Sequence, residues 1–268
     1  MKIGIIGIGV VGSAQRDLMR FLGHDVSTYD KFSNEKSNCN IDCMLPICEV
    51  IFLCLPTEQA KDGSINMSAF TDVMPQLKGY RGTVVIKSTV LPGTCNNLAN
   101  EYNLNISHNP EFLTEVNAKF DSLFCDRVIV GNTHNTSSNK VVKVYQPLLE
   151  GNPKIKLIMT DSITSEMCKY ANNLFLSMKV SFSNELKKIS DTVGADYSTI
   201  KESLIGDERI GPTHFGVSDK GGFGGMCFPK DTSAFQKLCK DKGFSFKTLD
   251  ATIEVNKPLR PEYYEVEK

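Results

Sequence analysis

The first 160 residues alternate short apolar runs with polar segments in which hydrophobic positions recur at helical spacing. The apolar runs predict strands at residues 2–6, 26–29, 50–55, 83–87, 105–108, 127–130 and 154–159. Helix-compatible segments lie between them, for example residues 13–22 and 67–77. Strands that alternate with helices indicate βαβ units joined by right-handed connections. We therefore predict an α/β domain over residues 1–160, built on a doubly wound, mainly parallel sheet.

After about residue 160 the pattern becomes helical. Residues 162–193 carry apolar side chains at helical spacing with no strong breaker, so they predict one long helix. Thr164, Ser165 and Glu166 offer N-cap chemistry, and Gly194 suits a C-cap. Further helices are predicted at residues 197–205 and 232–242, with an ordered, glycine-rich functional loop over 206–231. We predict an all-α region over residues 161–256 and a tail over 257–268 that frays.

Composition narrows the possible functions. The chain has 268 residues, 41% of them hydrophobic and 23% charged, as in an ordinary globular protein and unlike a disordered or fibrous one. Thirty basic and 31 acidic residues give a net charge of -1, which excludes bulk attraction to nucleic acid or an anionic membrane. No apolar run approaches the ~20 residues of a membrane span. Residues 1–6 lack a signal-peptide layout, because a glycine interrupts their apolar run.

Nine cysteines without a CxxC pair, together with only four histidines, give no zinc-site pattern, so no metal is expected. Cys39, Cys43 and Cys48 are closely spaced, which leaves a metal site as a minor alternative. Thiols in a chain without a leader predict a reducing cytoplasm.

A strict G-x-G-x-x-G motif follows the first predicted strand and opens a predicted helix. Its glycines permit a tight turn, close approach of a pyrophosphate and close packing of the helix on the strand. The second strand ends at Asp30, whose carboxylate would accept hydrogen bonds from the adenine ribose and repel a 2′-phosphate. This Rossmann-like pattern predicts NAD, while the neighbouring Lys31 leaves NADP open. The expected contacts are Gly7, Gly9, Val10, Val11, Gly12, Asp30 and Lys31.

A second glycine-rich stretch, residues 221–231, presents Cys227 just after four glycines. Lys230 and Asp231 follow, before a predicted helix. A nearby lysine or a helix N-terminus lowers the pKa of a thiol and favours the nucleophilic thiolate. The residues alone also permit a buried structural cysteine beside a glycine turn.

Residues 224–231, Gly-Gly-Met-Cys-Phe-Pro-Lys-Asp, resemble the catalytic-cysteine motif of the UDP-glucose 6-dehydrogenase family of nucleotide-sugar dehydrogenases. Other family motifs follow in the family's order along nearly the whole chain. They are Pro56-Thr57 with Asp62-Gly63, Lys87-Ser88-Thr89-Val90 with Pro92-Gly93, Asn109-Pro110-Glu111-Phe112-Leu113-Thr114-Glu115, Glu166-x-x-Lys169-x-x-x-Asn173 with Ser183-Asn184-Glu185, and Asp207-x-Arg209-Ile210-Gly211.

The resemblance implies oxidation of a sugar C6 alcohol to a carboxylate with two NAD per substrate, through a cysteine thiohemiacetal and a thioester. In this role Cys227 is the nucleophile, and Lys169 and Asn173 stabilise the oxyanion from one helix face. Asp231 assists proton transfer or orders the hydrolytic water, with Thr89 and Glu111. Without the resemblance, the helix residues would be interpreted as a solvated polar stripe.

The resemblance also implies binding roles. Cofactor contacts extend to Pro56, Thr57, Thr89, Glu115 and Lys230. The nucleotide-sugar substrate, with UDP-glucose expected, would meet Glu111, Phe112, Leu113, Lys169, Asn173, Arg209, Phe223, Gly224 and Cys227. Arg209 often acts across a dimer interface in this family, so a homodimer or higher homo-oligomer is expected.

The sequence ends where such relatives pass from their central helical region into a C-terminal UDP-binding domain, so a short form without that domain is expected. Two other functions remain open. A single-step β-hydroxyacid dehydrogenase would share the NAD domain and a catalytic lysine, yet would not need Cys227. A truncated, non-catalytic NAD-binding or partner protein would not need any of the catalytic residues.

Overall fold

The computed structural model describes residues 1–133 and 139–264 of the chain. The chain divides into two compact units. The first comprises residues 1–57 and 66–169, and the second comprises residues 58–65 and 170–268.

The first unit contains a seven-stranded sheet in the order β2-β1-β3-β4-β5-β6-β7. The strands are β1 (Lys2–Ile6), β2 (Asp25–Tyr29), β3 (Val50–Leu53), β4 (Thr83–Ile86), β5 (Asn105–His108), β6 (Arg127–Asn132) and β7 (Lys156–Asp161). Every neighbouring pair is parallel except β5 and β6, which are antiparallel. The predicted mainly parallel, doubly wound sheet is therefore confirmed. The strand order reverses at β1, where β2 and β3 flank it, and such a switch point favours ligand binding.

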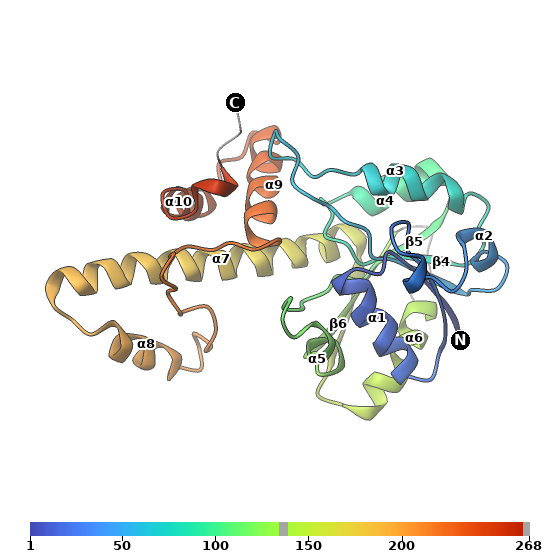
Figure 1. Cartoon of the computed structure of the whole chain (residues 1–268), viewed down its shortest axis with the longest axis horizontal. Coiled ribbons are helices and arrows are strands. Elements are labelled where there is room, and N and C mark those ends of the chain that lie inside the picture. The colour runs from blue at the N-terminus through green and yellow to red at the C-terminus, as the bar shows by residue number, and fades with distance from the viewer. Residues whose placement is uncertain (134–138, 265–268) are drawn as a thin grey trace. The chain divides into compact units, whose positions relative to one another are not determined.

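Helices cover both faces of this sheet (Figure 1). One hydrophobic core packs Ile51 and Leu53 of β3 beneath α3 (Ser68–Val73) and α4 (Thr94–Tyr102). The other packs Phe52, from the opposite face of the same strand, beneath α1 (Val10–Phe21) and α6 (Asn139–Gly151). This alternation is what a strand buried on both faces requires. The remaining helices are η1 (Asn34–Lys36), α2 (Ile41–Met44), η2 (Met74–Leu77) and α5 (Ala118–Leu123).

The helix predicted at residues 67–77 divides in two. α3 ends at Val73, and η2, with Pro75 in its first turn, continues the chain as a 3-10 helix. Proline lacks the N–H that an α-helix interior needs, which explains the change.

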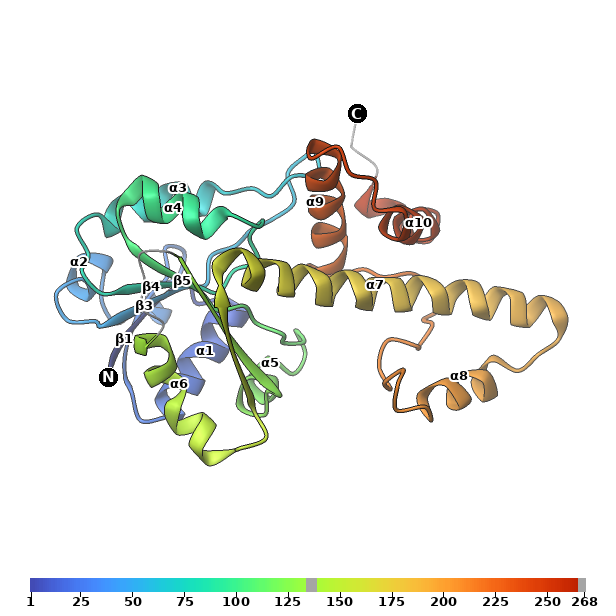
Figure 2. The same cartoon turned by 180° about the vertical axis from the view of Figure 1, so that it is seen from behind.

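The second unit is helical. It contains most of α7 (Ser162–Val193) together with α8 (Tyr197–Ile205), α9 (Phe228–Asp241), α10 (Lys247–Asn256) and η3 (Pro261–Tyr263). α7 and α8 have the predicted bounds. α9 starts earlier than the predicted residue 232, because Pro229 suits the first turn of a helix. α10 was not predicted as a separate helix. Figure 2 shows α9 and α10 beside α7.

The two ends of α7 differ in how well the sequence predicted them. Gly194 ends the helix as predicted, with φ of 75° and a hydrogen bond from Ala195 N to Ser190 O. The N-cap prediction at Thr164–Glu166 is wrong. The Asp161 carboxylate precedes the helix and accepts hydrogen bonds from Thr164 N and Oγ1, at 2.8 and 2.6 Å.

The structure describes residues 257–264 of the predicted tail. Residues 257–264 continue into η3, and Arg260 Nε donates to Gly221 O over 2.8 Å. The last four residues of the predicted tail lie outside the described part. Within residues 1–133 and 139–264, no helix is long and apolar enough to cross a bilayer.

Candidate active site and cofactor cradle

The G-x-G-x-x-G turn connects β1 to α1 in the first unit. Gly7 has φ of 88°, and a Cβ on Gly12 would lie 1.8 Å from Gly7 O, so both positions require glycine. A Cβ on Gly9 would meet no described atom within 4 Å. Gly9 precedes α1 and supplies no side-chain cap, so no N-cap side chain occupies the N–H groups of the first turn. This cradle fits a pyrophosphate.

Asp30 lies beside this turn, as predicted. Its Oδ2 accepts a hydrogen bond from Ile8 N at 2.7 Å, and its Oδ1 accepts one from Phe32 N at 2.9 Å. Each carboxylate oxygen keeps a lone pair that can accept from a ribose hydroxyl. Lys31 points elsewhere and forms an exposed ion pair with Asp72 at 2.8 Å. The residues therefore fit NAD better than a 2′-phosphorylated cofactor.

The carboxyl ends of β3, β4 and β5 share one edge of the sheet, and predicted site residues follow each strand. Thr57 is buried after β3, while Pro56 before it is exposed. Thr89 is half-buried after β4. Glu111 follows β5, and Glu115 is exposed farther along. Parallel pairing thus brings these motifs to the edge where the G-x-G-x-x-G turn also lies.

A buried ion pair lies at this edge. Lys169 Nζ is 2.9 Å from Glu111 Oε1, and the two side chains are 4% and 10% exposed. Glu111 Oε2 accepts a hydrogen bond from Leu113 N at 2.6 Å. The Phe112 ring centroid lies 5.5 Å from Lys169 Nζ and 4.0 Å from the Arg127 guanidinium carbon. The Lys169 ammonium therefore lies between the Glu111 carboxylate and the Phe112 ring, both of which stabilise its positive charge.

Glu166 has a supporting role. Its carboxylate accepts hydrogen bonds from Gly93 N at 2.5 Å and Cys95 N at 2.8 Å, and thereby caps the start of α4. Burial raises the pKa of the Glu166 carboxyl, and the hydrogen bonds from Cys95 and Gly93 oppose that rise. This side chain joins the turn after β4 to α7.

The second unit contains the other predicted cluster. Cys227 is exposed and immediately precedes α9. Asp231, one turn later, is fully buried, and its backbone N–H donates to Cys227 O at 2.8 Å. Asp231 Oδ2 accepts from Asn173 Nδ2 at 2.6 Å, while Oδ1 pairs with Lys230 Nζ. The structure thus brings Asn173, Lys230 and Asp231 together at the first turn of the helix that follows the cysteine.

Two loops of the second unit carry predicted substrate residues. Phe223 is buried within the glycine stretch, where Gly221, Gly222 and Gly225 have positive φ. Arg209 is 88% exposed and forms an ion pair with Asp207. Its guanidinium is therefore accessible from solvent.

Sequence reasoning missed Lys179, a buried cation of α7. Its Nζ donates to the carbonyls of Ile210 and Gly211, at 3.3 and 3.2 Å, and lies 4.3 Å from the Phe215 ring centroid. Burial lowers the pKa of Lys179. This lysine fixes the loop that carries Arg209, and no local motif marks it.

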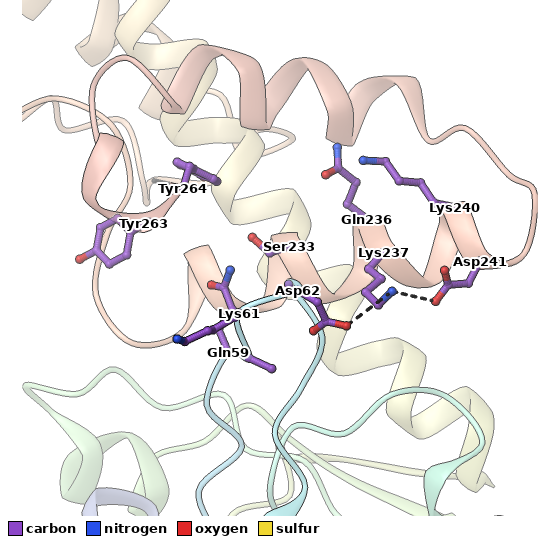
Figure 3. A pocket seen from close by; sticks show the side chains of 12 residues that line it. Gln59, Lys61, Asp62, Ser233, Gln236, Lys237, Lys240, Asp241, Tyr263 and Tyr264 are labelled. Carbon is purple, nitrogen blue, oxygen red and sulfur yellow. Dashed lines mark ion pairs between the residues drawn. The ribbon is translucent and has the colours of Figure 1, made fainter. Parts of the chain in front are cut away.

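A surface pocket of about 600 Å³ also lies in the second unit (Figure 3). It is bounded by residues 59–63, by one face of α9 and by Tyr263 and Tyr264. Lys237 pairs there with Asp62 and Asp241. Among the described residues, no group of three or more histidine, cysteine, aspartate or glutamate side chains is placed to hold a metal ion.

Comparisons with known proteins show which family this chain resembles. Residues 33–149 match the NAD binding domain of the UDP-glucose/GDP-mannose dehydrogenase family, and residues 163–258 match the central domain of the same family. UDP-glucose 6-dehydrogenase of Rickettsia bellii is 31% identical over 96% of this chain and 67% of its own length. UDP-glucose 6-dehydrogenase AglM of Haloferax volcanii is 32% identical over 96% and 69%.

A solved structure of a UDP-glucose dehydrogenase from Pyrobaculum islandicum superposes with a TM-score of 0.83 at 26% identity, covering 96% of this chain and 68% of that one. The chain thus spans about two thirds of the length of these relatives. The comparisons confirm the family resemblance drawn from the motifs and the prediction of NAD as cofactor.

Proposed function

We propose that this chain, which belongs to the UDP-glucose/GDP-mannose dehydrogenase family, oxidises the C6 alcohol of UDP-glucose to the carboxylate with Cys227 as nucleophile. The observation that carries this proposal is the placement of Cys227. Cys227 is exposed at the start of α9, one turn before a buried Asp231 that is hydrogen-bonded to Asn173.

The reaction requires two oxidations and one hydrolysis. The alcohol first loses a proton and a hydride and becomes an aldehyde. The Cys227 thiolate then adds to the aldehyde carbon and, on taking up a proton, forms a thiohemiacetal. This thiohemiacetal loses its hydroxyl proton and a second hydride to become a thioester. Water attacks the thioester carbonyl, the carbon–sulfur bond breaks, and the carboxylate, the thiol and one proton are released. NAD, when bound, accepts the hydride in each oxidation.

Lys169 and Asn173 are the proposed oxyanion-stabilising groups. They lie four residues apart in α7, so both side chains leave the same face of that helix. An ammonium and an amide N–H are donors that stabilise negative charge developing on a carbonyl oxygen. Asp231 is the proposed proton acceptor or water-ordering group, with Thr89 and Glu111 assisting it.

We propose that the NAD pyrophosphate lies against Gly7, Gly9, Val10, Val11 and Gly12, with the adenine ribose on Asp30. Pro56, Thr57, Thr89, Glu115 and Lys230 complete the cofactor contacts, and Lys31 lies at their margin. Glu111, Phe112, Leu113, Arg209, Phe223 and Gly224 are the proposed sugar-nucleotide contacts. The exposed guanidinium of Arg209 supports this role, because a planar bidentate donor suits phosphate and sugar oxygens.

We also propose a homodimer, formed through α7. Phe175, Phe182 and Ile189 recur every seven residues along this helix and are each about half exposed. A heptad-spaced apolar stripe is typical of a helix that packs against a partner helix.

The test is the amount of NADH produced per UDP-glucose by the purified chain and by a Cys227→Ala variant. Cys43→Ala is the matched control, because Cys43 is also exposed and lies outside the proposed site. The proposal predicts two NADH per sugar for the parent and for Cys43→Ala. It predicts loss of carboxylate formation in Cys227→Ala.

Other results point to the alternatives. One NADH per sugar that persists in Cys227→Ala indicates a single-step dehydrogenase. No turnover with a panel of UDP-, GDP- and TDP-sugars, although NAD binds, indicates a non-catalytic protein.

A further inference from the structure

The backbone of the cysteine loop is held mainly by side chains. Between Gly222 and Gly225, three N–H groups donate to side-chain oxygens that come from distant parts of the second unit. Gly222 N donates to Asn184 Oδ1 at 3.0 Å, Phe223 N to Asn256 Oδ1 at 2.7 Å and Gly225 N to the Tyr263 hydroxyl at 3.0 Å. A loop with so little backbone pairing depends on these acceptors for its conformation.

Most of these contacts come from one short segment, residues 256–263. Asn256 is fully buried, and besides accepting from Phe223 N it donates from Nδ2 to Phe223 O at 3.0 Å. Arg260 Nε donates to Gly221 O at 2.8 Å. Together with the Tyr263 bond, this segment makes contact with the loop at Gly221, Phe223 and Gly225.

The glycines of the loop fit closely against this segment. A Cβ on Gly222 would lie 2.5 Å from Asn256 Oδ1, and a Cβ on Gly224 would lie 2.8 Å from Arg260 Nη1 and 3.0 Å from the Tyr263 hydroxyl. We call residues 256–263 the loop clamp. The absence of side chains at Gly222 and Gly224 therefore leaves room for the loop clamp, as well as for a substrate.

Among the clamp residues, Tyr263 bonds the loop residue that is closest in sequence to the cysteine. That residue is Gly225, two positions before Cys227. Tyr263 lines the surface pocket of Figure 3 and is half-buried. It therefore lies at the surface and not in the hydrophobic core. Removing its hydroxyl therefore changes the hydrogen bond to the loop with little change in core packing.

We propose that Tyr263 is a positioning residue for Cys227, and that the loop clamp sets the orientation of the thiol at the start of α9. This inference rests on the proposed function only in assigning Cys227 as nucleophile. The bond from Gly225 N fixes the backbone where the glycine stretch gives way to Met226 and Cys227. Gly225 has φ of 78° and no Cβ, so its own side chain adds no restraint to the backbone at this point.

The experiment compares Tyr263→Phe with Tyr80→Phe in the full chain. Both substitutions remove one tyrosine hydroxyl bonded to a backbone group, but Tyr80 donates to Cys48 O in the first unit. The rate of alkylation of Cys227 by iodoacetamide is measured by peptide mass spectrometry from pH 6 to pH 10, with exposed Cys43 as an internal reference. NADH production and the thermal midpoint are recorded in parallel.

The proposal predicts that Tyr263→Phe changes the Cys227/Cys43 alkylation ratio or its pH midpoint and lowers kcat about three- to tenfold, as expected for a lost hydrogen bond. KM for NAD and the thermal midpoint stay within error. Arg260→Met, which removes the bond to Gly221 O, changes the ratio in the same direction. Tyr80→Phe leaves the ratio and kcat unchanged.

An unchanged alkylation ratio and kcat in Tyr263→Phe would overturn the proposal, whatever the parent's activity. If the parent produces no NADH from sugar nucleotides but the ratio still changes, the proposed function fails while the positioning role of Tyr263 stands.

Discussion

Lys169 Nζ lies 2.9 Å from Glu111 Oε1 in an ion pair that joins the carboxyl end of β5 to α7. Both side chains are almost fully removed from water. Desolvation of two charges is compensated only while both are present, so each residue keeps the other from being an unpaired buried charge. The same lysine is therefore needed for the stability of the first unit and for the proposed chemistry.

Replacing Lys169 with Met is expected to lower the free energy of unfolding by about 3 kcal/mol, because Glu111 is left buried without its partner. Urea denaturation followed by circular dichroism measures this change. Lys187→Met is the matched control, since its pair with Asp191 is exposed and worth about 0.5 kcal/mol or less. A Lys169→Met/Glu111→Leu double variant should recover part of the lost stability. An equal loss of stability in Lys169→Met and in the control Lys187→Met would contradict this account.

Two glycines of the cofactor turn should give opposite results. Gly12→Ala forces a Cβ to within 1.8 Å of Gly7 O, so α1 must shift and we expect a destabilisation of about 2 kcal/mol. Gly9 has φ of -77°, and a Cβ added there would meet no described atom within 4 Å, so Gly9→Ala should retain the stability of the parent. Its methyl group would nonetheless occupy the approach of the pyrophosphate, and NAD affinity should fall about tenfold or more.

Isothermal titration with NAD and thermal melting separate the two effects. Similar NAD affinity in Gly9→Ala and the parent protein would contradict the proposed position of the pyrophosphate.

The pH dependence of stability should report on His108. This histidine is fully buried, its Nδ1 lies 2.8 Å from Ser165 Oγ, and burial lowers its pKa to about 3, with the charges of Lys87 and Lys169 lowering it further. Because the unfolded state binds the proton more tightly, below its ordinary pKa of about 6.5 stability is lost as pH falls. Between pH 6.5 and 5 this histidine should cost about 2 kcal/mol.

Denaturant titrations of the parent and of His108→Gln at pH 7 and pH 5 measure this contribution. From pH 7 to pH 5, the free energy of unfolding should fall by about 2 kcal/mol less in His108→Gln than in the parent. Ser165→Ala keeps the titrating ring and should retain the parent's dependence. An unchanged dependence in His108→Gln would assign the acid sensitivity to other groups.

Strong local patterns allowed part of the fold to be predicted from sequence. α7 and α8 have the predicted bounds because their apolar spacing is regular and Gly194 provides a left-handed end. The turn at Gly7–Gly12 and the position of Asp30 followed from a motif in which backbone geometry requires Gly7 and Gly12.

Features that depend on contacts distant in sequence left no such pattern. The loop clamp uses Asn256 and Arg260, whose partners lie more than 30 residues away. Lys179 bonds to carbonyls, which any residue supplies, so its role is invisible in sequence. The antiparallel pairing of β5 with β6 is set by the path of the chain and not by the composition of either strand.

The apolar stripe on α7 should control the oligomeric state. Phe182 is 50% exposed at the centre of this heptad-spaced stripe, so Phe182→Glu places a charge where a second helix would pack and should yield a monomer. Phe21→Glu is the control, because Phe21 is 73% exposed at the end of α1 and lies outside the stripe. Sedimentation velocity measures the mass of each variant. If Phe182→Glu sediments with the parent as a dimer, the interface lies on another surface. A parent protein that is itself a monomer would contradict the proposed homodimer.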